Sequence, residues 1–268
     1  MRTTFNEVTP GRLLQAISRR VVDQSVRLEW ALGAEAKRNR ERLLKLKDSF
    51  PGETAIVICN GPSLNATDMS IVKSYKSIAM NRSYLMYEEW GFTPTFFTSI
   101  NHLVLDQFAD DIRALNMMKF VDFTHRDAFP EENGFCYFRI PPSLSDAFQT
   151  DLTKPMASGG TVTYVSLQLA YYLGFTKVII IGMDHRFSAV GIPNVAETRT
   201  EENDRDHVHP NYFPKGMKWQ LPDLHRSELA YREARKAFER DGRRIIDATV
   251  GGACEVFPKM ALADAVVA

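Results

Sequence analysis

The most informative residues for chemistry form a short turn, Cys59-Asn60-Gly61-Pro62-Ser63-Leu64. The turn follows the apolar run at 54–58, which is typical of a buried strand. Gly61 lets the backbone approach a phosphate or nucleoside closely, and the Asn60 amide can both donate and accept hydrogen bonds. Because ligands of α/β proteins bind at the carboxyl ends of strands, the turn predicts a nucleotide-binding site that also involves Ser63.

Asparagine recurs after two further predicted strands. Asn60, Asn81 and Asn101 each come at or directly after the end of a different strand. A single asparagine at such a position is explained by its tolerance of left-handed turn conformations. Three of them along one sheet edge favour a ligand, because uncharged amides suit the edges of a base and ribose hydroxyls.

A run of small residues at 157–161 precedes a predicted helix. Free N–H groups at a helix N-terminus can bind an anion, which makes Ser158 and Gly159 candidate ligand contacts. Ser158 or Thr161 could equally serve only as the cap of that helix. The run lacks the P-loop pattern, and the chain contains no G-x-G-x-x-G, which argues against a dehydrogenase.

A polar stretch at 204–213 contains the candidate general bases, His207 and His209. Imidazole titrates near neutrality and can therefore accept a proton from a hydroxyl. Tyr212 and Lys215 are candidates for binding phosphate oxygens, while a solvated loop without a catalytic role is the plain alternative. A metal site is a further alternative, with four ligands: Asp184, His185, His207 and His209. That spacing matches no standard zinc pattern.

These residues must be positioned by strands and helices that alternate after a break at 51–52. Strands are predicted at 54–59, 77–80, 94–99, 117–123, 177–181 and 244–247. Helices are predicted at 67–74, 83–90, 103–114, 161–172 and 223–241. Residues 125–155 read as irregular, and 186–222 are polar and long enough to form a lid. The alternation predicts a doubly wound, mostly parallel α/β sheet in one domain spanning residues 51–268.

The first part of the chain predicts a separate helical extension, residues 1–50. Apolar residues recur at helical spacing between 10 and 49, and residues 1–50 hold 11 Lys and Arg against 6 Asp and Glu. Such a helix can pack on the main domain or on a second subunit. Its basic, amphipathic character also allows peripheral contact with an anionic membrane.

The bulk composition sets the remaining limits. The 268 residues are 44% hydrophobic and 25% charged, as in an ordinary globular protein. Lys plus Arg and Asp plus Glu both total 33, so the charge indicates no nucleic-acid partner. The three cysteines form no C-x-x-C pair, which predicts neither a zinc site nor a disulfide framework. With no apparent signal peptide or membrane span, a cytoplasmic location is expected.

The ordered motifs resemble a known group of proteins over about residues 54–250. The turn at 60–64, Asn81, Ser158-Gly159 and Gly182-Met183-Asp184 resemble the bacterial sialyltransferases of glycosyltransferase family 42. They equally resemble the polysaccharide-cluster and flagellin-modification proteins that share a domain with archaeal 6-hydroxymethylpterin diphosphokinase, the MptE-like proteins. The segment at 241–249 is also similar to that wider set. The resemblance implies a Rossmann-like fold related to the GT-A arrangement of glycosyltransferases.

The resemblance also implies roles for individual residues. Asn60 and Asn81 match the asparagines that contact a CMP-sugar, and Asn101 matches an asparagine after the third strand. Ser158 and Gly159 match a pair that lies near the carboxylate of the donor. A loop histidine acts as base with a tyrosine steadying the phosphate, which here implies His207 or His209 with Tyr212. Asp184 lies in a shared motif, and we expect it at the donor site.

The implied reaction is an inverting transfer from a CMP-activated acidic sugar, such as sialic acid, another nonulosonic acid or Kdo, to a bacterial surface glycan. The expected partners are thus the nucleotide-sugar donor and a glycan acceptor, and no cofactor is required. The principal alternative is diphosphate transfer from ATP to a pterin alcohol, which would need Mg²⁺ held by carboxylates. A non-catalytic module that binds a glycan or a partner is a third alternative.

Overall fold

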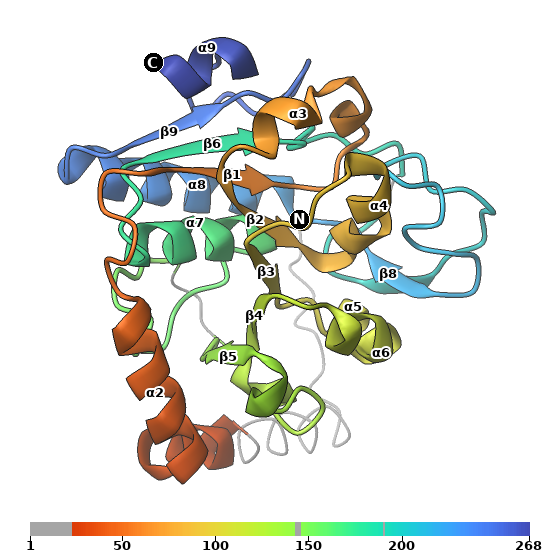
Figure 1. The fold of residues 1–268 in the computed structure, drawn as a ribbon. Helices are drawn as coiled ribbons and strands as arrows, with labels where there is room; N and C mark the ends of the chain where they lie inside the picture. The colour runs from red at the N-terminus through yellow and green to blue at the C-terminus, as the bar shows by residue number, and fades with distance from the viewer. Residues whose placement is uncertain (1–22, 143–145, 190) are drawn as a thin grey trace, which may run out of the picture.

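The computed structural model describes residues 23–142, 146–189 and 191–268, and their central feature is a seven-stranded sheet (Figure 1). The strands are β1 (Thr54–Ile58), β2 (Lys76–Met80), β3 (Phe96–Ser99), β4 (Met118–Asp122), β5 (Phe135–Phe138), β6 (Lys177–Ile181) and β9 (Arg244–Asp247). Their order is β5-β4-β3-β2-β1-β6-β9, and every neighbouring pair is parallel. The predicted α/β fold with a doubly wound, Rossmann-like sheet is confirmed.

The strand order creates one switch point, between β1 and β6. The chain builds the sheet outward from β1 to β5 and then returns to place β6 on the other side of β1. The ladder continues past the strand ends, since Cys59 N donates to Ile181 O at 2.9 Å and Gly61 N donates to Gly182 O at 2.8 Å. The turn after β1 therefore lies directly beside the turn after β6, where open α/β sheets bind their ligands.

Helices cover both faces of the sheet (Figure 1). They include α2 (Ala34–Leu46), α3 (Met69–Val72), α4 (Tyr87–Trp90), α5 (His102–Gln107), α6 (Ala109–Ala114), α7 (Val162–Tyr172), α8 (Leu224–Arg240) and α9 (Leu262–Val267), and residues 23–32 are also helical. Short 3₁₀ turns occupy Pro62–Ala66, Asn81–Met86, Phe123–His125 and Glu131–Asn133. Successive strand residues point to opposite faces, so Val57 packs with α7 and α8 whereas Ile56 packs with α3 and α9.

Three predictions about these elements were wrong in detail. Residues 125–155 are not wholly irregular, because Phe135–Phe138 form edge strand β5. This strand has four residues, which are too few to show the two-residue alternation typical of a strand. The helix predicted at 103–114 is two helices that meet at Phe108. The N-terminal helix is interrupted at Gly33, and its predicted part before residue 23 lies outside the described residues.

Helix α2 protects the outer edge of β5 through one buried side chain. The Asn39 amide donates to Tyr137 O at 3.0 Å, and its oxygen accepts from Tyr137 N at 2.8 Å. The side chain thus satisfies both backbone groups of Tyr137, as a further strand would do at this residue. This described part of the extension packs on the main domain. Within the described residues, no helix is both long and apolar enough to cross a bilayer.

Candidate functional site

The segment predicted as a lid, residues 186–222, packs over the carboxyl edge of the sheet through its described residues, 186–189 and 191–222. It contains a small antiparallel hairpin formed by β7 (Ala196–Thr198) and β8 (Lys218–Gln220). Val208 N donates to Asn60 O at 2.7 Å, which ties the lid to the turn after β1. The Gln107 side chain accepts from Lys218 N at 2.7 Å and donates to Lys218 O at 2.8 Å. The lid is therefore anchored both to the turn after β1 and to α5.

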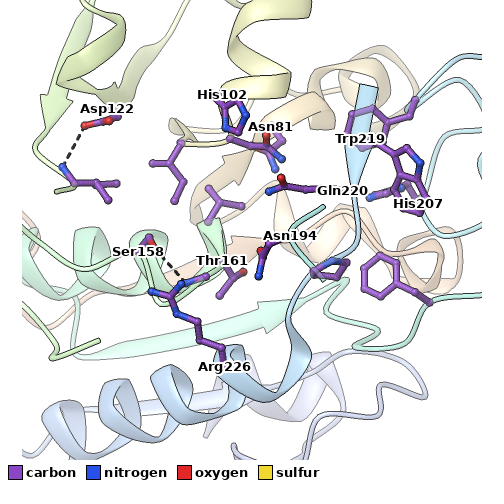
Figure 2. A pocket seen from close by; sticks show the side chains of 18 of the residues that line it. Asn81, His102, Asp122, Ser158, Thr161, Asn194, His207, Trp219, Gln220 and Arg226 are labelled. Carbon is purple, nitrogen blue, oxygen red and sulfur yellow. Dashed lines mark hydrogen bonds between the residues drawn. The ribbon is translucent and has the colours of Figure 1, made fainter. Parts of the chain in front are cut away.

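A cavity of about 350 Å³ lies between the lid, the ends of β2, β3 and β4, and the start of α7 and α8. Figure 2 shows Asn81 and His102 at one side, with Ser158, Thr161 and Arg226 at the other. Gln220 and Asn194 of the lid reach between the two groups (Figure 2). Polar side chains from at least four separate elements thus converge on one space, which is typical of a small-molecule site.

A smaller cavity of about 140 Å³ lies at the switch point between β1 and β6. Asn60, Gly61 and Asp184 line it. Asn81, His207 and Tyr212 line both cavities, so the two spaces adjoin at these side chains. The arrangement offers two compartments with an imidazole at their junction.

His207 is held by a buried carboxylate and by an aromatic ring. Its Nδ1 lies 2.9 Å from Asp204 Oδ2, and the Asp204 side chain is 0% exposed. Burial alone would raise the pKa of Asp204, but the hydrogen bond and charge of His207 and the nearby Arg199 guanidinium hold that pKa below its ordinary value. The His207 ring is stacked on Tyr212 with centroids 3.9 Å apart. With Nδ1 bound to Asp204, the nitrogen left to accept a proton is Nε2.

Tyr212 is itself fixed by the tip of β2. Its buried hydroxyl accepts from Arg82 N at 3.4 Å and is hydrogen-bonded to the Asn81 side chain. The Arg82 guanidinium donates to Asn211 O at 2.7 Å and to Tyr212 O. Asn81 adopts a left-handed conformation with φ of 51°, and its Oδ1 accepts from Ser99 Oγ at 2.9 Å. The predicted base and the predicted tyrosine thus belong to one network with Asn81.

The turn after β1 needs glycine because the turn after β6 lies against it. A Cβ built on Gly61 would lie 1.8 Å from Asp184 Oδ2 and 2.7 Å from Gly182 O. Asp184 also accepts from Ser63 Oγ at 2.6 Å and from Ser63 N at 3.2 Å. Ser63 therefore orients Asp184, and it does not line either cavity itself.

Asn60 carries an acceptor atom that lacks a partner. The residue is 9% exposed, and its buried Oδ1 has no hydrogen bond to any described residue. An unmet buried acceptor costs about 1–3 kcal/mol, so such atoms are uncommon outside functional sites. Because Asn60 lines the smaller cavity, a ligand with a hydrogen-bond donor would satisfy this oxygen.

The N-terminus of α7 opens onto the larger cavity. Thr161 caps this helix, since its side chain accepts from Thr163 N at 3.2 Å. Gly159 and Gly160 have φ of 58° and 72°, which lets the chain turn sharply into the helix. Beside them Arg226 forms a two-point ion pair with Asp146, with N–O distances of 2.8 Å. The positive helix end suits an anionic group, whereas the charge of Arg226 is already balanced by Asp146.

Some predicted residues lie away from the cavities. His209 is not part of either lining, and its Nδ1 accepts from Asn211 N at 3.1 Å. Gly159 packs against Tyr164 and Ala230, so it shapes the backbone without lining the space. Lys215 forms an exposed ion pair with Glu202 at 2.6 Å. Of the two candidate bases, the geometry brings only His207 into the site.

The four-ligand metal site is not formed. Across residues 23–142, 146–189 and 191–268, no group of three or more His, Cys, Asp or Glu side chains is placed to hold a metal ion. His185 lies 3.1 Å from Glu228, and His207 is engaged by Asp204. The three cysteines are buried and free, and none forms a disulfide.

Several lining residues were absent from the sequence prediction. Asp122 ends β4 and lines the larger cavity, where its oxygens accept from Ile140 N and Thr124 Oγ1. Its position at the end of a predicted strand was the available signal. Trp219 and Arg226 also line this cavity. They come from the lid hairpin and the first turn of α8, and only the three-dimensional fold brings them to the strand ends.

Comparison with known proteins gives a family match and a similarity to solved structures. The model of the family described as 6-hydroxymethylpterin diphosphokinase MptE-like matches residues 32–190. The fold is similar to that of the MAf glycosyltransferase from Magnetospirillum magneticum AMB-1, with a TM-score of 0.50 and 17% identity. That similarity covers 94% of this chain and 42% of the MAf chain. No match is found among curated proteins. Since the family model spans more than half of the chain, the protein belongs to the 6-hydroxymethylpterin diphosphokinase MptE-like family.

Proposed function

We propose that the protein is an inverting glycosyltransferase that uses a CMP-activated acidic sugar, with His207 as the general base. The observation that carries the proposal is the buried Asp204–His207 pair, whose imidazole lies where the two cavities adjoin. A base at this junction can reach a hydroxyl in one compartment and a donor that extends into the other. The similarity in fold to a glycosyltransferase is consistent with this chemistry.

The proposed donor site combines the smaller cavity with the start of α7. The free Asn60 oxygen would accept from the cytosine amino group or a ribose hydroxyl of CMP. The helix end near Ser158 and Arg226 would receive the carboxylate of the acidic sugar. Asn81 and Asn101 line the larger cavity, where they would bind sugar hydroxyls. The anchored lid would keep water from the reacting carbon.

The proposed reaction is a single displacement. Nε2 of His207 takes the proton of the acceptor hydroxyl as that oxygen forms a bond to the anomeric carbon. The bond from the anomeric carbon to the phosphate oxygen breaks, and CMP leaves with the electron pair. The configuration at the anomeric carbon is inverted because attack and departure occur on opposite sides.

A thermal-shift panel of CMP, CDP, UDP, GDP and ATP, each with and without Mg²⁺, tests the proposal. A ligand that binds only the folded state raises the melting temperature by mass action. We expect CMP alone to stabilise the protein and transfer from CMP-sugars to be lost in His207→Gln. A shift with ATP and Mg²⁺ only would refute the CMP-sugar proposal. No shift with any nucleotide would favour a binding module.

The family description supports a second candidate, diphosphate transfer from ATP to a hydroxymethylpterin. That reaction would require Mg²⁺ near the phosphates. The three carboxylates in the linings do not gather at one point, because Asp122 lines the larger cavity while Asp184 and Asp206 line the smaller one. All three also accept hydrogen bonds from the protein, and they belong to no described group of three or more possible metal ligands. We therefore rank this function second and derive no step through a metal.

A further inference from the structure

The lid contains a buried chain of charged side chains behind the His207 ring. Arg199 follows β7, and its side chain is 5% exposed, with the guanidinium over the ring of Trp219. Arg199 Nη2 lies 3.6 Å from Asp204 Oδ1, and Asp204 Oδ2 binds His207. Three side chains of one segment thus form a line from the hairpin to the cavity. A solvated loop would not bury two opposite charges in this way.

We propose that Asp204 is a positioning residue that holds His207 in the tautomer protonated on Nδ1, so that Nε2 is the proton acceptor in the site. The inference rests on the proposed function for its catalytic meaning, but the tautomer is a property of the protein alone. A carboxylate only accepts hydrogen bonds, so the nitrogen that faces it carries the hydrogen. The stacked Tyr212 ring keeps the imidazole plane in the orientation that this bond requires.

The partners of the other Asp204 oxygen make the proposal testable with one substitution. Asp204 Oδ1 accepts from Asp206 N at 3.0 Å and faces the Arg199 guanidinium. In Asp204→Asn the single amide oxygen must remain on these two donors, which places the NH₂ group where Oδ2 now faces His207. That NH₂ group can only donate. His207 must then accept at Nδ1 and carry its hydrogen on Nε2, where it can no longer act as a base.

The charged and titratable groups around the ring are few. Asp204 bonds the ring and Tyr212 stacks on it, while Phe187 and Phe213 contact its edges without charge. Asp206 is adjacent in the chain, and its Oδ1 accepts from Ser188 N at 2.7 Å. Among these groups, Asp204 is the one with a direct hydrogen bond to the imidazole.

The test is a nitrogen-15 NMR experiment on the His207 ring in the full chain. The pH is raised until the two ring nitrogens give clearly different shifts, which marks the neutral imidazole, and the signal is assigned by its loss in His207→Gln. We expect hydrogen on Nδ1 in the natural protein and on Nε2 in Asp204→Asn. The matched control is Glu202→Gln, an exposed carboxylate of the same lid, which should leave the tautomer unchanged. Hydrogen on Nε2 in the natural protein would overturn the proposal, whether or not Asp204→Asn folds.

Transfer from a CMP-sugar provides a second readout. Replacing the carboxylate by an amide should lower kcat by about 10²–10⁴-fold with little change in KM, the range given by general base catalysis. A higher KM with an unchanged kcat would contradict the positioning role. If the tautomer switches as expected but the natural protein transfers no sugar from CMP donors, the proposed function fails while the assignment of Asp204 stands.

Discussion

The rings of His207 and Tyr212 are stacked face to face, with planes 4° from parallel. The sequence did not indicate that Tyr212 would stack on the histidine ring. The Tyr212 hydroxyl points to Arg82 N and Asn81, while its ring supports the imidazole. The resemblance had implied a tyrosine that steadies a phosphate. The geometry supports a tyrosine that orients the proposed base, His207.

Two substitutions at Tyr212 separate these roles. Tyr212→Phe keeps the stacked ring and removes a hydroxyl with weak hydrogen bonds, so we expect a loss of about 1 kcal/mol in unfolding free energy and less than a tenfold fall in kcat. Tyr212→Leu removes the stacking, worth about 0.5–1.5 kcal/mol beyond area burial, and should lower kcat much further. Urea unfolding and transfer rates measure both effects. Equal losses of kcat in the two variants would assign the function to the hydroxyl instead.

The low pKa of Asp204 predicts a pH dependence of stability. Its pKa in the folded protein is depressed, so the carboxylate stabilises the fold above its unfolded pKa of about 3.9. This contribution is lost as the pH falls through the folded pKa. We therefore expect the unfolding free energy of the natural protein to fall more steeply below about pH 4 than that of Asp204→Asn. Parallel curves from urea titrations between about pH 3 and 6 would contradict the depressed pKa, and Glu202→Gln should follow the natural protein.

The sequence predicted the elements whose signal is local. The apolar runs before Asn60 and Gly182 were correctly predicted as strands, and the switch-point chemistry follows from them. The order of the strands is set by contacts between distant segments, which no local pattern encodes. For that reason Asp122, at the end of β4, was not connected with Asn81 and Asn101. The burial of Asp204 could not be predicted either. Its partner Arg199 is separated from it by polar residues, and such a sequence is typical of a solvent-exposed loop.

Edge protection by α2 gives a prediction about stability and association. In Asn39→Leu, both Tyr137 N and Tyr137 O would lose their buried partners, at about 1–3 kcal/mol for each group. Differential scanning fluorimetry should show a clear fall in melting temperature, and light scattering should show aggregation through the uncovered strand. The exposed Asn116→Leu is the control and should change neither. A stable, monodisperse Asn39→Leu protein would mean that the edge is protected by other contacts.

The unpaired oxygen of Asn60 predicts that one substitution affects binding and folding differently. Asn60→Ala removes an acceptor that has no protein partner, so the free protein should lose less than about 1 kcal/mol of stability, or gain some. Binding of CMP should weaken by about tenfold, the equivalent of one hydrogen bond of about 1.4 kcal/mol. Calorimetric titration with CMP and urea unfolding of the free variant test the two halves separately. Ser70→Ala serves as the control for binding, because Ser70 is exposed in the first turn of α3 and lines neither cavity. Unchanged CMP affinity in Asn60→Ala would remove Asn60 from the donor site, whereas a large loss of stability would mean that its oxygen already has a partner in the free protein.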